Sequence, residues 1–290
     1  MVKLAQESYN SRMTNPYFEV VLAALIWGSA GIFVKILNLP STTVTFFRLS
    51  IPTIILLIYL LHKHSPMLKQ INKLILFASF INALRMLFYF LAYSLTSIGN
   101  AVVMLYTWPL FAVLFSAISL KERITRTKIL LLVFTFIGIV LMFTNNQFSF
   151  KSKDFLGMGS MLLSSALYAF TIPIFKKQLA KYTKPETIFY QNVVGAIVFL
   201  PFLFFNKPFP SLSQTVIVSI YSFLIGFIGF MLFFAGLKKI KASTASLLSY
   251  AEVVSAVILA AIFFRETVTF AMLIGGAIIL TVSYFVRKTD

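Results

Sequence analysis

Two charged side chains lie deep inside long apolar stretches, and they are the residues with the clearest chemistry. Arg85 lies near the middle of the apolar segment 73–95, and Glu252 lies near the middle of 242–264. A charge at the depth of a bilayer is costly, so it usually faces a cavity, a ligand or a partner charge. The planar guanidinium of Arg85 suits a carboxylate or phosphate, whereas Glu252 suits a cationic group or a coupling proton. The pair therefore offers a site for each end of a zwitterion, or a mutual ion pair that ties the two segments together.

Further polar side chains recur on the same helical faces as these charges. With about 100° between successive helical residues, the polar residues of three segments each gather on one side. They are Ser79, Asn82, Arg85, Tyr89 and Tyr93 in 73–95 with Thr96 directly after it, Ser160, Ser164, Tyr168 and Thr171 in 156–175, and Ser246, Ser249 and Glu252 in 242–264. Such stripes are what a solvated, ligand-sized space between helices needs.

Aromatic side chains are weaker candidates for this site, because most rings in so apolar a chain contact lipid or neighbouring helices. The expected substrate-binding residues are Arg85, Glu252, Asn82, Tyr89, Tyr93, Trp27, Tyr106, Trp108, Tyr168, Ser249 and Tyr250. Arg48 is interpreted differently, because it lies near the outer end of its segment, where its side chain can snorkel toward water. Pro109 frees a carbonyl one turn earlier, near Leu105, which either serves the site or marks a plain kink.

Ten apolar stretches carry these residues. The chain has 290 residues, of which 59% are hydrophobic and 33 are Phe, and its mean hydropathy is +0.92. Such a composition needs lipid as its solvent, and crossing it takes about 20 helical residues. An all-α membrane protein is therefore expected, with ten transmembrane helices. The expected spans are 17–37, 43–61, 73–95, 99–119, 127–144, 156–175, 186–205, 213–237, 242–264 and 269–286.

The net charge of +17 suggests nucleic acid at first sight, but the placement of the basic residues indicates topology instead. With the N-terminus inside, 18 of the 25 basic residues fall on the cytoplasmic side and five outside, which is a strong positive-inside signal. The inner set is Lys3, Arg12, Lys63, Lys69, Lys73, Lys121, Arg123, Arg126, Lys128, Lys176, Lys177, Lys181, Lys184, Lys238, Lys239, Lys241, Arg287 and Lys288; the outer set is Lys35, Lys151, Lys153, Lys207 and Arg265. Both termini are expected in the cytoplasm.

The sequence also repeats itself. Tyr106–Thr125 aligns without gaps with Tyr250–Thr269 at an offset of 144. This match aligns Tyr106 with Tyr250, Lys121 with Arg265, Glu122 with Glu266 and Thr125 with Thr269. A second match, at an offset of 141, aligns Lys35 with Lys176. A third match aligns Thr45–Arg48 with Thr187–Tyr190. Five spans per repeat is an odd number, so the second copy must enter the membrane from the opposite side. Two inverted five-helix repeats are the architecture of alternating-access carriers.

The chain resembles the drug/metabolite transporter superfamily, in particular its EamA-type members. The residues that carry the resemblance are Trp27-Gly28-Ser29, Arg48, Ala92, Ala101, Pro109, Glu122 and Glu266. The resemblance covers nearly the whole chain and implies a central cavity lined largely by spans 1, 3, 4, 6, 8 and 9. Val253 stands opposite Pro109 in the second half, so a helix break at this level is expected in one half only.

The expected domains are a cytoplasmic segment 1–16, a first repeat 17–144, an external linker 145–155, a second repeat 156–286 and a cytoplasmic C-terminus 287–290.

The expected function is secondary active transport of a small polar metabolite, led by amino acids and amino-acid-like compounds, across the cell inner membrane. A nucleotide-like or vitamin carrier is the alternative, and a non-transporting receptor or assembly protein is the alternative of another class. The expected partners are the substrate, the bilayer and a coupling proton, without nucleic acid. No enzyme motif, cofactor or metal site is expected, and the chain has no Cys.

Overall fold

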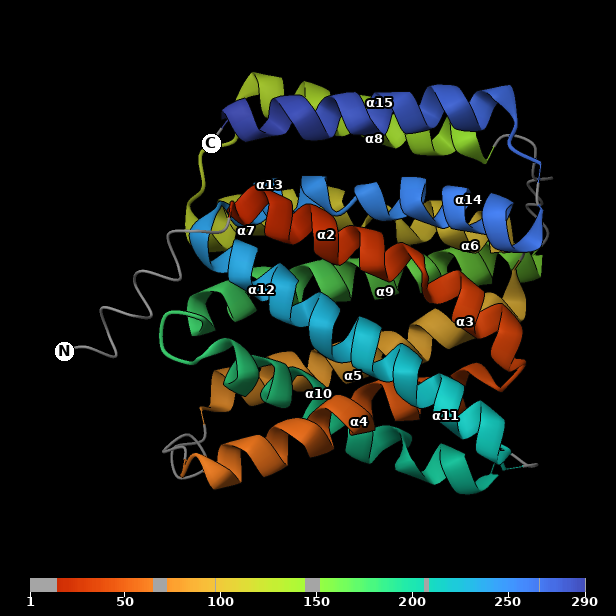
Figure 1. Ribbon diagram of the computed structural model, residues 1–290. Coiled ribbons are helices and arrows are strands. Elements are labelled where there is room, and N and C mark those ends of the chain that lie inside the picture. The colour runs from red at the N-terminus through yellow and green to blue at the C-terminus, as the bar shows by residue number, and fades with distance from the viewer. Residues whose placement is uncertain are drawn as a thin grey trace.

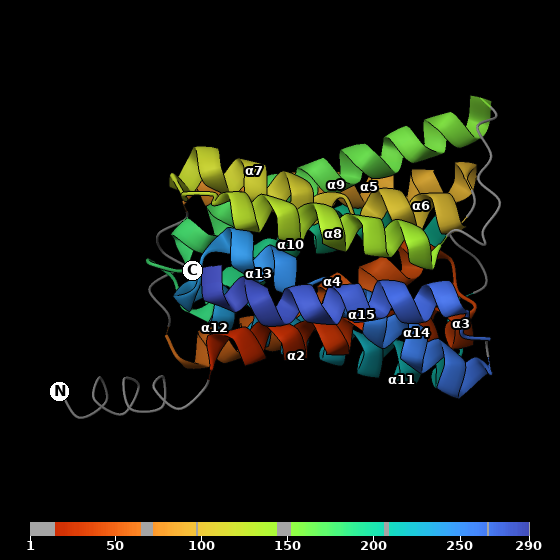
Figure 2. The same ribbon diagram turned by 90° about the horizontal axis from the view of Figure 1, so that it is seen from above.

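The structure is a computed structural model that describes residues 15–64, 72–96, 98–143, 152–205, 209–265 and 267–289. Glu266, residues 1–14 and most of the expected external linker lie outside this part. The described residues form helices and no strands, and the helices run roughly along one direction (Figures 1 and 2). They are α2 (Pro16–Gly28), α3 (Ala30–Leu37), α4 (Ser41–His62), α5 (Lys73–Leu95), α6 (Ile98–Leu105), α7 (Trp108–Leu120), α8 (Arg126–Met142), α9 (Ser152–Gln178), α10 (Lys184–Phe205), α11 (Leu212–Tyr221), the π-helix η2 (Ser222–Gly229), α12 (Phe230–Lys239), α13 (Ala242–Leu248), α14 (Ala251–Phe264), α15 (Phe270–Val286) and the 3₁₀-helix η3 (Arg287–Thr289).

Eight helical runs in the described residues are long and apolar enough to cross a membrane. They are 16–33, 41–62, 73–95, 100–120, 153–178, 184–205, 212–239 and 242–264. Helices α8 and α15 are shorter, with 17 residues each, so the expected count of ten crossings stays a prediction. Large apolar side chains such as Phe80, Ile118 and Ile197 are 51%, 69% and 66% exposed. An outer surface of this kind suits contact with lipid tails.

Three of the long runs are interrupted, the first at Ser29 between α2 and α3 and two others in their middle. Helix α6 ends at Leu105 and α7 begins at Trp108, and α13 ends at Leu248 while α14 begins at Ala251. The expectation that the break belongs to one half is wrong, because the second run breaks at the corresponding level without a proline. The freed carbonyl expected at Leu105 is present, and it accepts a hydrogen bond from Ser165 Oγ at 2.9 Å.

Local backbone structure recurs at the offset of 144 found in the sequence. Lys121 and Arg265 both end their helices in the left-handed conformation, with φ of 54° and 53°. Four residues later, Thr125 and Thr269 cap the next helix by accepting a hydrogen bond from the N–H group three residues on, at 3.2 and 3.3 Å. An N-cap hydroxyl satisfies a helix donor that would otherwise lack a partner. The two chain segments therefore reach α8 and α15 by the same backbone route.

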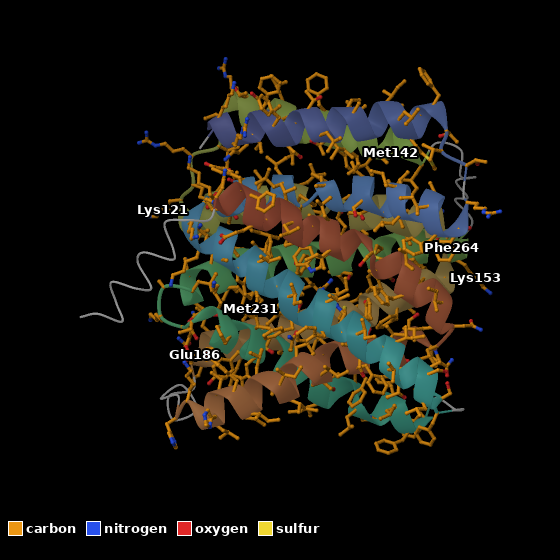
Figure 3. All side chains as sticks on the ribbon, viewed as in Figure 1. Lys121, Met142, Lys153, Glu186, Met231 and Phe264 are labelled. Carbon is orange, nitrogen blue, oxygen red and sulfur yellow. The ribbon has the colours of Figure 1, made fainter. Side chains whose placement is uncertain are left out.

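These corresponding turns lie at opposite ends of the bundle. Figure 3 shows Lys121 and Glu186 at one end and Lys153 and Phe264 at the other. Helices α8 and α15 pack against each other along one side (Figures 1 and 2). Their contact depends on Gly138, because a Cβ atom there would lie 3.1 Å from the Gly275 carbonyl oxygen. A Cβ atom on Gly275 would likewise clash with the Gly138 carbonyl oxygen, so both glycines allow the two helices to approach closely.

Candidate functional site

Arg85 is held in the interior by two neighbouring helices. Its side chain is 7% exposed, and its Nε donates to Asn82 Oδ1, one turn earlier on α5, at 3.0 Å. The guanidinium carbon lies 4.2 Å from the centre of the Tyr168 ring on α9, a cation–π contact. Asn82 in turn donates to the Gln191 carbonyl of α10 at 3.2 Å. These contacts orient the guanidinium but engage only one of its five N–H groups.

Glu252 lies in the first turn of α14, directly after the break in its run. A carboxylate at a helix N-terminus is stabilised by the helix dipole. Arg85 and Glu252 interact electrostatically, yet their side chains form neither a direct ion pair nor a hydrogen bond in the described structure. The sequence allowed a salt bridge between Arg85 and Glu252, and this salt bridge is therefore not formed in this conformation. The terminal nitrogens of Arg85 and the carboxylate of Glu252 keep their hydrogen-bonding capacity for another partner.

Four of the tyrosines expected at the site lie within electrostatic range of Glu252. The side chains of Tyr89, Tyr93, Tyr106 and Tyr168 all interact electrostatically with its carboxylate. The rings of Tyr89 and Tyr93 lie 4.9 Å apart. Helices α5, α9 and α14 and the break between α6 and α7 thus bring one acid and several phenols into the same part of the interior.

Two further aromatic candidates join this group, one through a ring contact and one through a hydrogen bond. Trp108, at the start of α7, lies 5.0 Å from the Tyr168 ring in an edge-to-face arrangement, so it packs against the same ring that Arg85 contacts. Tyr250 donates from its hydroxyl to the Tyr106 carbonyl oxygen at 2.9 Å. Both contacts link helices that are distant in sequence, which the sequence pattern could not specify.

Trp27 and Ser249 have structural partners instead. Trp27 Nε1 donates to the Ile225 carbonyl of η2 at 3.2 Å, and its ring packs 5.0 Å from Phe230. Ser249 Oγ donates to the Ala245 carbonyl one turn earlier in its own helix, at 2.9 Å. Neither polar group is directed toward Arg85 or Glu252 by these bonds, so both residues frame the site rather than supply free donors to it.

Arg48 is the residue that the sequence analysis misjudged. Its guanidinium carbon lies 5.8 Å from the centre of the buried Phe230 ring on α12, and it interacts electrostatically with Glu252, Arg85 and Tyr168. The half-buried side chain therefore extends toward the interior group, whereas a snorkelling side chain would extend toward water. The position of Arg48, about two helical turns from the start of α4, is the sequence feature that could have indicated an interior location.

A second polar cluster lies at the Lys121 end of the bundle. The Glu122 carboxylate accepts hydrogen bonds from the N–H groups of Ala242 and Ser243 at 2.7 and 3.1 Å, and from Ser243 Oγ at 2.7 Å. Lys128, which belongs to the basic residues expected on the cytoplasmic side, is 1% exposed and donates to Ser243 and Thr244 at 3.1 and 2.8 Å. This Glu122 cluster ties the turn after α7 to the start of α13.

Two shallow hollows on the outer surface are separate from the candidate site. One is lined by residues of α5, α7 and α9 that include Phe115 and Lys177, and the other by residues of α5 and α9 that include Phe88 and Ser160. None of the eleven expected substrate-binding residues lines either hollow. Ser160, which the helical stripe assigned to the site face, lies at one of these outer hollows instead.

Comparison with known proteins identifies the family. The model of the EamA-like transporter family matches residues 15–144 and again residues 155–287. The chain belongs to the EamA-like transporter family. Its relatives are transporters and not enzymes, and with its apolar helices the chain is a multi-pass membrane protein.

Individual relatives of this EamA-family transporter carry different names. An uncharacterized transporter of Archaeoglobus fulgidus is 27% identical over 90% of this chain and 92% of its own length. A pseudopaline exporter of Pseudomonas aeruginosa is 30% identical over 63% of this chain and 64% of its own length. An S-adenosylmethionine uptake transporter of Rickettsia bellii is 24% identical over 87% and 86% of the two chains. One solved crystal structure covers 96% of this chain and 99% of its own, with a TM-score of 0.83 at 18% identity, which shows the shared fold.

Proposed function

We propose that this transporter carries a small polar metabolite, an amino acid or amino-acid-like compound, across the cell inner membrane by alternating access. The observation that carries the proposal is the pair of interior charges, Arg85 and Glu252, which attract each other but form no direct ion pair. Their opposite signs suit the carboxylate and the ammonium group of one substrate. A purely structural pair would instead be expected to close on itself, because unpaired charges in hydrocarbon are costly.

Two inverted five-helix repeats form the framework in this proposal. The family model matches two successive segments of the chain, and the left-handed caps at Lys121 and Arg265 have nearly the same φ. Lys121 and Phe264, the residue before the second cap, lie at opposite ends of the bundle (Figure 3). This placement supports a second repeat that enters from the other side. With the basic residues setting the orientation, both termini and the Lys121 end are cytoplasmic.

Alternating access requires one end to open while the other closes. The Glu122 cluster supports this mechanism, because several hydrogen bonds hold the Lys121 end closed, and hydrogen bonds can break and reform without a change in fold. The breaks at Tyr106–Thr107 and Ser249–Tyr250 give the two crossing helices a place to bend. Proton coupling or exchange would drive the cycle. Relatives named for export and for uptake leave both directions open.

A nucleotide-like or vitamin cargo is the second candidate. The Trp108 and Tyr168 rings beside Arg85 favour it, since a planar ring could stack where the guanidinium now lies against Tyr168. In that case the aromatic residues and not the charges would determine affinity, and neutral ring compounds would compete with the cargo.

Solute counterflow in vesicles tests the proposal. Purified protein is reconstituted, the vesicles are loaded in turn with unlabelled amino acids, nucleosides and vitamins, and entry of the same labelled solute is followed against protein-free vesicles. The proposal expects exchange of at least one amino acid or amino-acid-like compound. Exchange of a nucleoside or vitamin alone favours the second candidate. Specific binding without exchange contradicts the carrier and favours a receptor.

A further inference from the structure

The interior holds more positive than negative charge. Among the described residues, the charges set well inside the apolar helices are the guanidiniums of Arg48 and Arg85 and the carboxylate of Glu252. The other charged residues of the described part lie near helix ends or in turns. Charge at this depth needs compensation by a partner, and one carboxylate compensates only one of the two guanidiniums. The side chains of the described residues therefore leave one guanidinium at this depth without a carboxylate of its own.

The hydrogen-bonding groups of these side chains show the same deficit. Arg85 uses its Nε for Asn82, and its two terminal nitrogens donate to nothing else in the described structure. The Arg48 guanidinium contacts the Phe230 ring and makes no hydrogen bond among the described residues. Each guanidinium presents a planar fork that matches a carboxylate. The guanidiniums of Arg48 and Arg85 and the free carboxylate of Glu252 thus lie within electrostatic range of one another.

We infer that the cargo is an amino acid with a second acidic group, so that two guanidiniums hold its two carboxylates and Glu252 holds its ammonium. Arg48 is then a specificity-determining residue that separates acidic amino acids from neutral ones. The inference rests on the proposed carrier function and narrows its substrate class. A neutral amino acid would leave one guanidinium without an anion, and a basic one would add a further positive charge to the interior.

The position of Arg48 allows its side chain to be tested without disturbing the packing of α4. The backbone of α4 packs closely on η2, because a Cβ atom on Gly226 would lie 2.7 Å from the Arg48 carbonyl oxygen. This contact involves only the main chain of Arg48, so Arg48→Gln leaves it in place. Arg287 offers a matched control, because its guanidinium also lies over a ring, 4.1 Å from the centre of Tyr284, but at the end of the bundle.

The experiment compares solutes that differ in charge at nearly constant shape. Reconstituted full-length protein is assayed for counterflow of L-glutamate, L-glutamine, L-aspartate, L-asparagine and L-lysine, and for electrogenic current on addition of each. L-Glutamate or L-aspartate is expected to exceed its amide by about tenfold or more in apparent affinity, as for one charge-assisted bidentate contact. Arg48→Gln is expected to remove most of this preference, Arg48→Lys to restore part of it, and Arg287→Gln to leave it unchanged.

Several results overturn the inference. They are a preference for an amide or for L-lysine in the unmutated protein, an unchanged preference in Arg48→Gln, and no exchange of any of the five solutes. The first two leave the carrier proposal intact, since exchange still occurs. After the third, counterflow of the wider solute panel decides the carrier proposal separately. If Arg48→Gln does not insert stably, the preference and the current of the unmutated protein still decide the substrate class, and Arg48→Lys decides the role of Arg48.

Discussion

The hydroxyl of Tyr250 donates a hydrogen bond to the main-chain oxygen of Tyr106 at 2.9 Å, and the two rings lie 6.4 Å apart. The two residues are separated by 144 positions, the same offset that aligns the two halves of the sequence. Each one lies at the break of its own crossing helix. Corresponding residues of the two halves therefore touch each other at the points where their helices are interrupted.

Tyr250→Phe tests this contact. The ring stays and the hydrogen bond is lost, so the free energy of unfolding is expected to fall by about 1 kcal/mol, with a slower rate of counterflow. Thermal unfolding in detergent and counterflow at saturating solute measure the two effects. Tyr284→Phe, on a ring that is half exposed, is the control. Equal behaviour of the two variants would contradict a role for the Tyr106–Tyr250 contact.

Arg85→Lys separates charge from geometry at the centre of the site. The ammonium keeps the charge but loses the bidentate fork and the Nε bond to Asn82. Apparent affinity for the cargo is expected to fall about tenfold or more in Arg85→Lys and further in Arg85→Ala, with normal amounts of inserted protein. Arg287→Ala serves as the control for loss of a guanidinium that lies on a ring. Full transport by a stably inserted Arg85→Ala protein would remove Arg85 from the site.

Glu252→Gln distinguishes proton coupling from substrate binding. A coupling carboxylate must gain and lose a proton, so the amide is expected to abolish uptake driven by a pH gradient while counterflow at equal pH continues. A carboxylate that binds the cargo ammonium gives a different result, because the amide then weakens both processes by about tenfold or more. The two assays on one preparation separate these roles. If both assays match the unmutated protein, neither role holds.

The proposed inverted repeat makes a topological prediction. The chain has no Cys, so Arg123→Cys and Thr267→Cys each introduce a single thiol, at exposed positions beyond α7 and α14. An impermeant thiol reagent applied to intact cells is expected to label Thr267→Cys and to label Arg123→Cys only after the membrane is opened. Labelling of both from the same side would rule out the inverted arrangement and the alternating-access mechanism built on it.

Glu122→Ala is expected to loosen the Lys121 end. The substitution removes the acceptor for two N–H groups and one hydroxyl at the start of α13, so the cytoplasmic side should open more often. Labelling of a Ser246→Cys thiol, buried on α13, is expected to become about tenfold faster, as for loss of one charge-assisted bond. Arg123→Ala, on the neighbouring exposed residue, is the control. An unchanged labelling rate would contradict the closing role of the Glu122 cluster.

The sequence by itself determined the helices and the burial of Arg85. Helix α5 matches the expected span 73–95 at both ends. An apolar segment in lipid must pair its backbone polar groups within the segment, and a single segment can do so only as a helix. Arg85 was identifiable because a charge in the middle of such a segment has to face the interior. The offset of 144 was visible as well, and the paired caps at Lys121 and Arg265 follow it.

Only the tertiary structure decided three other features, which are the direction of one side chain, the burial of another and the position of a helix break. Arg48 extends inward because Phe230, on a helix far along the chain, receives its guanidinium, and no local pattern sets the direction of a long side chain. Lys128 is buried because Ser243 and Thr244 accept its hydrogen bonds. The second helix break occurs without proline, beside the hydrogen bond between Tyr250 and Tyr106. In each case the partner comes from a segment distant in sequence, so packing of the helices and not their composition determines the result.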